Sequence, residues 1–161
     1  MGLNTFTLVH ILISLAGILS GLVVLGGWIA GRNLRLLTAI FLTATVLTSA
    51  TGFFFPFQGF TPAYAVGILS LVLLTVAIYA LYLGKLAGVW RKAFVITALA
   101  ALYFNFFVLV AQLFQKTPAL KALAPTQTEP PFAIAQVLVF LSFVVLGVAA
   151  VRGFRGVVVS A

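Results

Sequence analysis

The amino-acid sequence predicts an all-α integral membrane protein, a bundle of five transmembrane helices with its N-terminus outside and its C-terminus in the cytoplasm. The first observation is composition: of 161 residues, 64% are hydrophobic and only 6% are charged, whereas soluble domains carry about 25% charged residues. The second is that the charges stand at the ends of apolar stretches long enough to cross a bilayer. The third is that most of the cations fall on one side of the predicted membrane.

Four stretches of the chain contain no charged residue, and together they have room for five spans. They are residues 1–31, 36–84, 93–115 and 130–151. A span requires about 20 apolar residues, so the second stretch holds two, separated by a turn-forming segment between Pro56 and Pro62. The predicted helices cover residues 6–30, 36–56, 62–84, 92–115 and 131–151. Each is expected to be helical because lipid offers the backbone no other hydrogen-bond partner.

The first helix and the one long loop complete a single predicted domain over residues 1–161. The first helix lacks a basic segment before its apolar run, and the run is too long for a signal peptide, so we expect a retained span. The loop over 116–130 is predicted outside, with Thr117 and Pro118 starting a short surface helix. Glu129 stands at the start of the last span, where the helix dipole favours a carboxylate.

The basic residues set the predicted orientation. Seven of them follow the first helix, the third helix or the last helix: Arg32, Arg35, Lys85, Arg91, Lys92, Arg152 and Arg155. The other side holds Lys116 and Lys121. Because cytoplasmic loops carry the excess of Lys and Arg, the larger group is expected in the cytoplasm, and rings such as Trp28 and Trp90 are expected at that membrane boundary. We expect a multi-pass protein of a bacterial inner membrane.

Composition excludes several kinds of chemistry. The chain has no Cys, so disulfides, thiolate catalysis and zinc–thiolate sites are absent. One His (His10) and one acidic residue build neither a metal cage nor a pair of catalytic carboxylates, so we predict no catalytic residue and no metal site. No phosphate-binding glycine loop ends in Lys. The net charge of +8 is explained by membrane orientation rather than by nucleic-acid binding, because the cations flank apolar runs.

Polar side chains are few in the predicted spans, and most fall in the outer half. His10 and Ser14 share one face of the first helix, and Asn105 and Gln112 share one face of the fourth. We predict that polar residues from four helices line an outward-facing pocket that binds a ligand. Its predicted residues are His10, Ser14, Thr48, Ser49, Thr51, Asn105, Gln112, Glu129 and Gln136. Side chains that point to separate surfaces would contradict the pocket.

Each of these features has a structural alternative. Ser and Thr in membrane helices often donate to the carbonyl four residues earlier, and Asn and Gln often join helices by hydrogen bonds. Two Gly-x-x-x-Gly motifs, at Gly17 and at Gly27, fit close helix packing, either inside one chain or at a homodimer seam. His10 is ionisable and lies within a span, which makes it a candidate for function. Its position about one turn inside the outer mouth favours an interfacial role instead.

Three segments carry a resemblance: Gly21-Leu-Val-Val-Leu-Gly-Gly, Thr48-Ser-Ala-Thr-Gly-Phe-Phe-Phe-Pro-Phe-Gln-Gly-Phe-Thr-Pro-Ala and Gly67-Ile-Leu-Ser-Leu. The first half of the chain is similar in these segments to small predicted bacterial inner-membrane proteins, a group of unknown function. Some members of a broader, similar-looking set carry His at helix ends, and this chain has Tyr64 at such a place. The resemblance therefore implies a membrane protein without implying an activity, and Tyr64 weakens a haem or metal site carried across.

The sequence leaves three classes of function open. The first is a binding or accessory protein, which holds a lipid, a quinone or a haem in the outer-half pocket or packs against a larger membrane complex. Short loops and the absence of catalytic pairs favour it. The second is a small-solute transporter or channel, which usually needs broken helices or charges at mid-depth. The third is an enzyme that uses His10 and Glu129 on a lipid-like substrate, and we expect this class less than the first.

Overall fold

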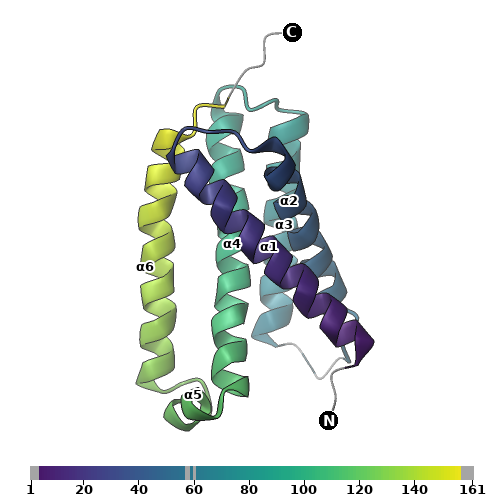
Figure 1. The fold of residues 1–161 in the computed structure, drawn as a ribbon, viewed down its shortest axis with the longest axis vertical. Helices are drawn as coiled ribbons and strands as arrows, with labels where there is room; N and C mark the ends of the chain where they lie inside the picture. The colour runs from purple at the N-terminus through teal and green to yellow at the C-terminus, as the bar shows by residue number, and fades with distance from the viewer. Residues whose placement is uncertain (1–3, 57–58, 60, 157–161) are drawn as a thin grey trace.

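A computed structural model describes residues 4–56, 59 and 61–156, and it confirms the all-α bundle (Figure 1). The helices are α1 (Thr5–Ile29), α2 (Arg35–Gly52), α3 (Pro62–Tyr82), α4 (Val89–Lys116), α5 (Pro118–Leu123) and α6 (Pro130–Gly153). Five of them, all but α5, are long and apolar enough to cross a membrane. The described residues include no β-strand. The chain is therefore a multi-pass membrane protein.

The helix ends follow local hydrogen bonding. α2 ends at Gly52, short of the predicted residue 56, because the Phe53 amide already donates to the carbonyl of Ala50, three residues back, at 3.2 Å. α5 begins at Pro118 with Thr117 in the N-cap position, as the sequence predicts. Proline suits the first turn because its missing N–H has no helical partner there. Residues 57, 58 and 60 of the predicted turn before α3 lie outside the described residues.

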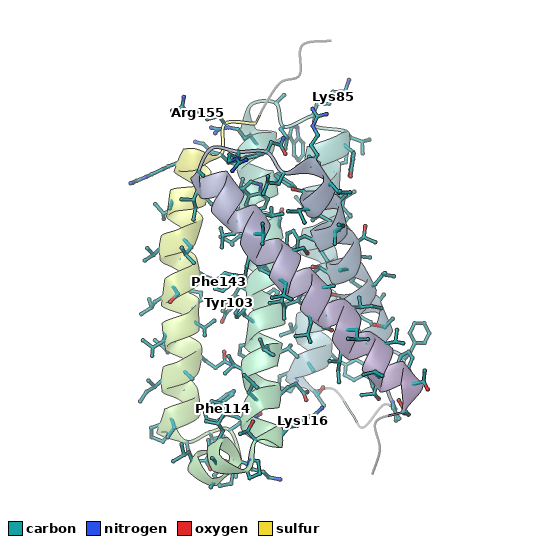
Figure 2. All side chains as sticks on the ribbon, viewed as in Figure 1. Lys85, Tyr103, Phe114, Lys116, Phe143 and Arg155 are labelled. Carbon is teal, nitrogen blue, oxygen red and sulfur yellow. The ribbon has the colours of Figure 1, made fainter. Side chains whose placement is uncertain are left out.

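The two ends of the bundle differ in charge. α1, α3 and α6 finish where α2 and α4 begin, and the seven basic residues that the sequence groups together stand at or just beyond these helix ends. We call this the basic end. Figure 2 shows Lys85 and Arg155 there, with Lys116 at the opposite end. That opposite end carries α5 and the start of α1, and we call it the α5 end.

The packed core lies in the half of the bundle next to the basic end. In α1 the buried residues run from Gly17 to Trp28, and in α3 they run from Ser70 to Ala80. Figure 1 shows α1 crossing the bundle diagonally, with its last turn beside the end of α6. The helices therefore converge at the basic end and separate toward the α5 end.

Glycine on α1 permits the convergence. A Cβ atom at Gly21 would lie 2.6 Å from Leu102 Cδ1 on α4 and 2.9 Å from Phe41 Cδ2 on α2. One turn earlier, a Cβ at Gly17 would lie 3.3 Å from the hydroxyl of Thr45. Small residues allow helices to approach closely in a membrane. The Gly-x-x-x-Gly motif at Gly17 is thus used for packing inside the chain.

α6 reaches α1 through a second glycine, Gly153. A Cβ atom there would lie 2.5 Å from the carbonyl oxygen of Ile29 and 2.6 Å from that of Trp28. Trp28 lies in the last turn of α1, at the basic end, but it is only 1% exposed, so its ring faces the core and not the surrounding membrane. Its ring instead packs against Phe94 and Phe154, with centroids 5.3 and 5.7 Å away. This aromatic cluster closes the basic end of the core.

We expect Gly153→Ala to lower the thermal unfolding midpoint in detergent, because the new methyl group meets two backbone carbonyls that side-chain rotation does not move. Overpacking of this kind costs about 1–3 kcal/mol. The control is Gly26→Ala on α1, where nothing lies within 4 Å of the added Cβ. The control midpoint should stay unchanged or rise. Equal effects of the two substitutions would contradict the close approach at Gly153.

Candidate ligand cavity

A cavity of about 860 Å³ occupies the half of the bundle next to the α5 end. Its walls come from α1, α2, α3 and α4. On α1 the lining runs from Thr7 to Ile18, which spans about 16 Å at 1.5 Å per residue. On α4 it runs from Asn105 to Lys116. The cavity therefore extends from the α5 end to about the middle of the bundle, where the packed core begins.

Burial along α4 changes at the level where the cavity begins. In the packed half, Ala98 and Ala101 are completely buried and let neighbouring helices approach. In the other half α4 carries larger side chains, among them Phe104, Phe106 and Phe107, and the ring of Phe106 packs against Phe143 on α6 with centroids 5.1 Å apart. Between Leu102 and Phe114 no residue of α4 is buried. The change from small to bulky side chains coincides with the change from packed core to cavity.

Most of the polar residues predicted as a ligand site lie on the wall of this one cavity. They are His10, Ser14, Thr48, Ser49, Asn105 and Gln112. Thr51 does not line the cavity but contacts His10 from α2. The hydroxyls of Ser14 and Thr51 donate to the carbonyls four residues earlier, His10 and Leu47, which is the structural alternative for such residues. The helix faces identified from sequence therefore meet in space.

The hydrogen bonds around His10 assign its neutral tautomer. His10 Nδ1 lies 2.8 Å from Thr51 Oγ1, whose own proton is directed to the carbonyl of Leu47 at 2.6 Å. Thr51 must therefore accept, so Nδ1 carries the proton of neutral His10 and Nε2 keeps a free lone pair. The ring of Phe55 stands edge-on to the imidazole at 5.0 Å and fixes its plane. His10 thus offers the cavity an acceptor at Nε2.

Three polar atoms on cavity-lining residues are buried and lack a hydrogen-bond partner within the described chain. They are Ser70 Oγ, Thr48 Oγ1 and Asn105 Nδ2. The Ser70 residue is only 2% exposed. A buried donor without a partner costs about 1–3 kcal/mol, so such atoms call for an explanation. Three further atoms of this kind, on Trp28, Thr38 and Gln136, lie away from the cavity.

Besides Thr51, two more predicted site residues lie outside the cavity. Gln136 is on α6, and its Nε2 donates to the carbonyl of Phe107 on α4 at 3.1 Å. It joins two helices, which is the alternative role weighed for an amide in a membrane. Glu129 precedes α6 and binds the turn before it: Thr126 donates to its carboxylate through both its amide and its hydroxyl. The residues that Gln136 and Glu129 contact, Phe107 and Thr126, do not line the cavity either.

The sequence prediction missed Ser70, which lines the cavity. It is one serine among the Leu, Ile and Val of α3, without a stripe of polar neighbours to mark its face. The signal that identifies it is structural, namely burial without a hydrogen-bond partner. Lys116, at the end of α4, was also not predicted and lines the same cavity.

The described residues contain no group of three or more His, Cys, Asp or Glu side chains that would hold a metal ion. The cavity instead combines an apolar lining from residues such as Ile11, Leu15 and Val108 with a small number of polar groups. This combination is typical of small-molecule sites. Comparison of the chain with known protein families, curated proteins and solved structures finds no match.

The turn held by Glu129 should depend on pH. Desolvation acts to raise the pKa of Glu129, but hydrogen bonds from Thr126 and from the backbone amides of Thr126 and Thr128 outweigh it and hold the pKa below its ordinary value of 4.5. A lowered pKa stabilises the turn fully above pH 4.5, and the effect is lost as pH falls through the lower folded value. We expect amide exchange at Thr126 and Thr128, compared with a neighbouring turn, to speed up over that acidic interval.

The control for this prediction is Glu129→Gln, which keeps the side chain's size and removes its charge. Its exchange should be faster at neutral pH and should lose the acid-dependent step. If acid changed the amide exchange rates of the native chain no more than those of the variant, the role given to Glu129 would be contradicted.

Proposed function

We propose that this protein binds one small hydrophobic molecule with a polar head, from the classes lipid, quinone and haem, in the cavity between α1 and α4. The observation that carries the proposal is the set of unpartnered donors on Ser70, Thr48 and Asn105, three residues that line the cavity. In a membrane no bulk water compensates such groups. A bound molecule with polar atoms supplies the missing partners, and its apolar part contacts the aliphatic lining.

A quinone head fits these groups better than the other two classes. Its carbonyl oxygens accept hydrogen bonds, which the hydroxyl of Ser70 and the amide of Asn105 donate. The reduced form carries a hydroxyl, and Nε2 of His10 accepts from it. His10 alone supplies one axial ligand for a haem, and the described cavity adds no second His. An ordinary lipid acyl chain leaves the polar groups unpartnered.

The position of the cavity favours binding over conduction. The packed core with Trp28 and Phe41, each 1% exposed, lies between the inner limit of the cavity and the basic end. A transport path needs a second opening on that side. One chain builds the whole cavity, so packing against other subunits would not disturb it. The same binding site is therefore compatible with an accessory role in a larger membrane complex.

The experiment is a native mass spectrum of the protein extracted in mild detergent from its own membrane, followed by identification of any released molecule. We expect an added mass that matches a quinone. His10→Ala and Asn105→Leu should each weaken binding about tenfold, the effect of one lost hydrogen bond of about 1.4 kcal/mol, and so lower the occupancy. Thr51→Val should have a smaller effect, because it removes only the acceptor that orients His10.

The matched control is Thr75→Val on α3. Its hydroxyl donates to the carbonyl of Leu71 at 2.8 Å on the exposed face of the helix, away from the cavity. The control should bind as the native chain does. A bare mass from native protein, or occupancy unchanged in both His10→Ala and Asn105→Leu while the protein remains folded, would contradict the proposal.

We also propose that the basic end faces the cytoplasm of a bacterial inner membrane, which puts the cavity mouth outside. The support is the excess of basic residues at that end. A fluorescent protein fused to the C-terminus should fluoresce, because it folds in the cytoplasm, and a phosphatase that is active only outside should be inactive at the same position. The reverse pair of results would invert the orientation and place the cavity mouth inside.

A further inference from the structure

A second hollow, separate from the cavity, lies between α4 and α6. It is an open groove of about 420 Å³, and it shares no lining residue with the cavity. α4 contributes Ala100 and Tyr103 to it, and α6 contributes Phe143, Gly147 and Arg152, together with aliphatic neighbours. All of its lining is apolar except the phenol of Tyr103 and the guanidinium of Arg152.

The shape of the groove is fixed by one glycine and by aromatic packing. At Gly147 an added Cβ would lie 2.7 Å from Leu99 Cδ2, so α6 approaches α4 closely there only because the side chain is absent. Farther from the basic end, the ring of Tyr103 meets Phe140 and Phe143 edge-on, with centroids 5.6 and 5.7 Å apart. These rings form a firm wall at the end of the groove away from Arg152.

The charge at the other end of the groove has no acidic partner. Arg152 lies in the last turn of α6 and is exposed. The only acidic residue of the chain, Glu129, stands just before the first turn of the same helix, about 34 Å away at 1.5 Å per residue. At this end the chain after α1 runs beside the end of α6, because a Cβ atom at Gly31 would lie 3.5 Å from the carbonyl oxygen of Gly153.

The length of the groove is close to the thickness of the hydrocarbon layer of one leaflet. From Arg152 to Phe140 α6 spans about 18 Å at 1.5 Å per residue, and half of the hydrocarbon core of a bilayer is about 15 Å. An extended acyl chain that begins beside Arg152 therefore reaches the wall formed by Tyr103 and Phe140. The cation is at headgroup level and the apolar lining is at acyl-chain level.

We propose that this groove binds one anionic phospholipid from the leaflet at the basic end. The phosphate lies against Arg152, and one acyl chain follows the groove past Gly147 to the aromatic wall. The choice of lipid rests on charge. Arg152 has no acidic partner and stands at the end of a hydrophobic groove of leaflet length, and its positive charge attracts an anionic headgroup more strongly than a zwitterionic one. The inference is independent of the function proposed for the cavity.

The test is native mass spectrometry of the purified protein in detergent, titrated with phosphatidylglycerol and with phosphatidylcholine of the same acyl chains. We expect phosphatidylglycerol to bind more tightly. Arg152→Gln should weaken it about fivefold, as expected for one basic side chain near a lipid surface. Arg155→Gln removes an equal charge from the same end but not from the groove, and it should have a smaller effect.

A second pair of variants tests the groove itself. Ala100→Phe fills the groove from α4 and should reduce the number of tightly bound phosphatidylglycerol molecules by one. Val145→Phe places the same ring on α6 at a side chain that is 68% exposed and outside the groove, and it should leave that number unchanged. Folding of all variants is checked by their thermal unfolding midpoints.

Three outcomes would overturn the proposal. Equal affinities for the two lipids would remove the headgroup contact. Equal effects of Ala100→Phe and Val145→Phe would place the bound lipid elsewhere. A dimer mass that competes with lipid and disappears in Ala100→Phe would assign the groove to a second copy of the chain. None of these results bears on occupancy of the cavity, which is measured with the His10 and Asn105 variants.

Discussion

The arrangement of this bundle depends on close backbone approach at its basic end. Lipid is as apolar as the helix surfaces, so helices in a membrane associate by packing and hydrogen bonding rather than by the hydrophobic effect. Here Gly21 lets α1 approach α2 and α4, and Gly153 lets α6 reach the last carbonyls of α1. The buried residues of α1 and α3 accordingly lie in the half next to the basic end, and the cavity occupies the other half of the bundle.

The same constraint explains where polar groups are tolerated. In the packed half, Thr45 is completely buried and satisfies its hydroxyl by donating to the carbonyl of Phe41 at 2.7 Å. In the open half, His10 and Thr51 satisfy each other across two helices, and they leave Nε2 of His10 available. Ser70 and Asn105 stand at the boundary between the halves with donors that nothing in the described chain accepts. Two of the three unpartnered groups on the cavity wall thus stand where the core ends, whereas three others, on Trp28, Thr38 and Gln136, lie away from the cavity.

The fold was predictable from the sequence because hydropathy and charge position act locally, on one helix at a time. The site was predictable in part for the same reason: the spacing of His10 and Ser14 fixes a face, and their place in the helix fixes a depth. Which helices face each other depends on packing between them, which spacing does not encode. Gln136 has the expected depth, yet α6 lies on the other side of α4, so its amide meets Phe107 instead of the cavity. Ser70 was missed because a single serine carries no periodicity.

A molecule in the cavity would contact several helices at once. His10 on α1, Ser70 on α3 and Asn105 on α4 all line the cavity, and an occupant that bonds to them would connect these three helices. A ligand that binds only the folded bundle stabilises it by mass action, by about 2.7 kcal/mol at one hundred times its dissociation constant. In the proposed function, the unpartnered donors on the cavity wall are therefore the groups through which an occupant would stabilise the bundle.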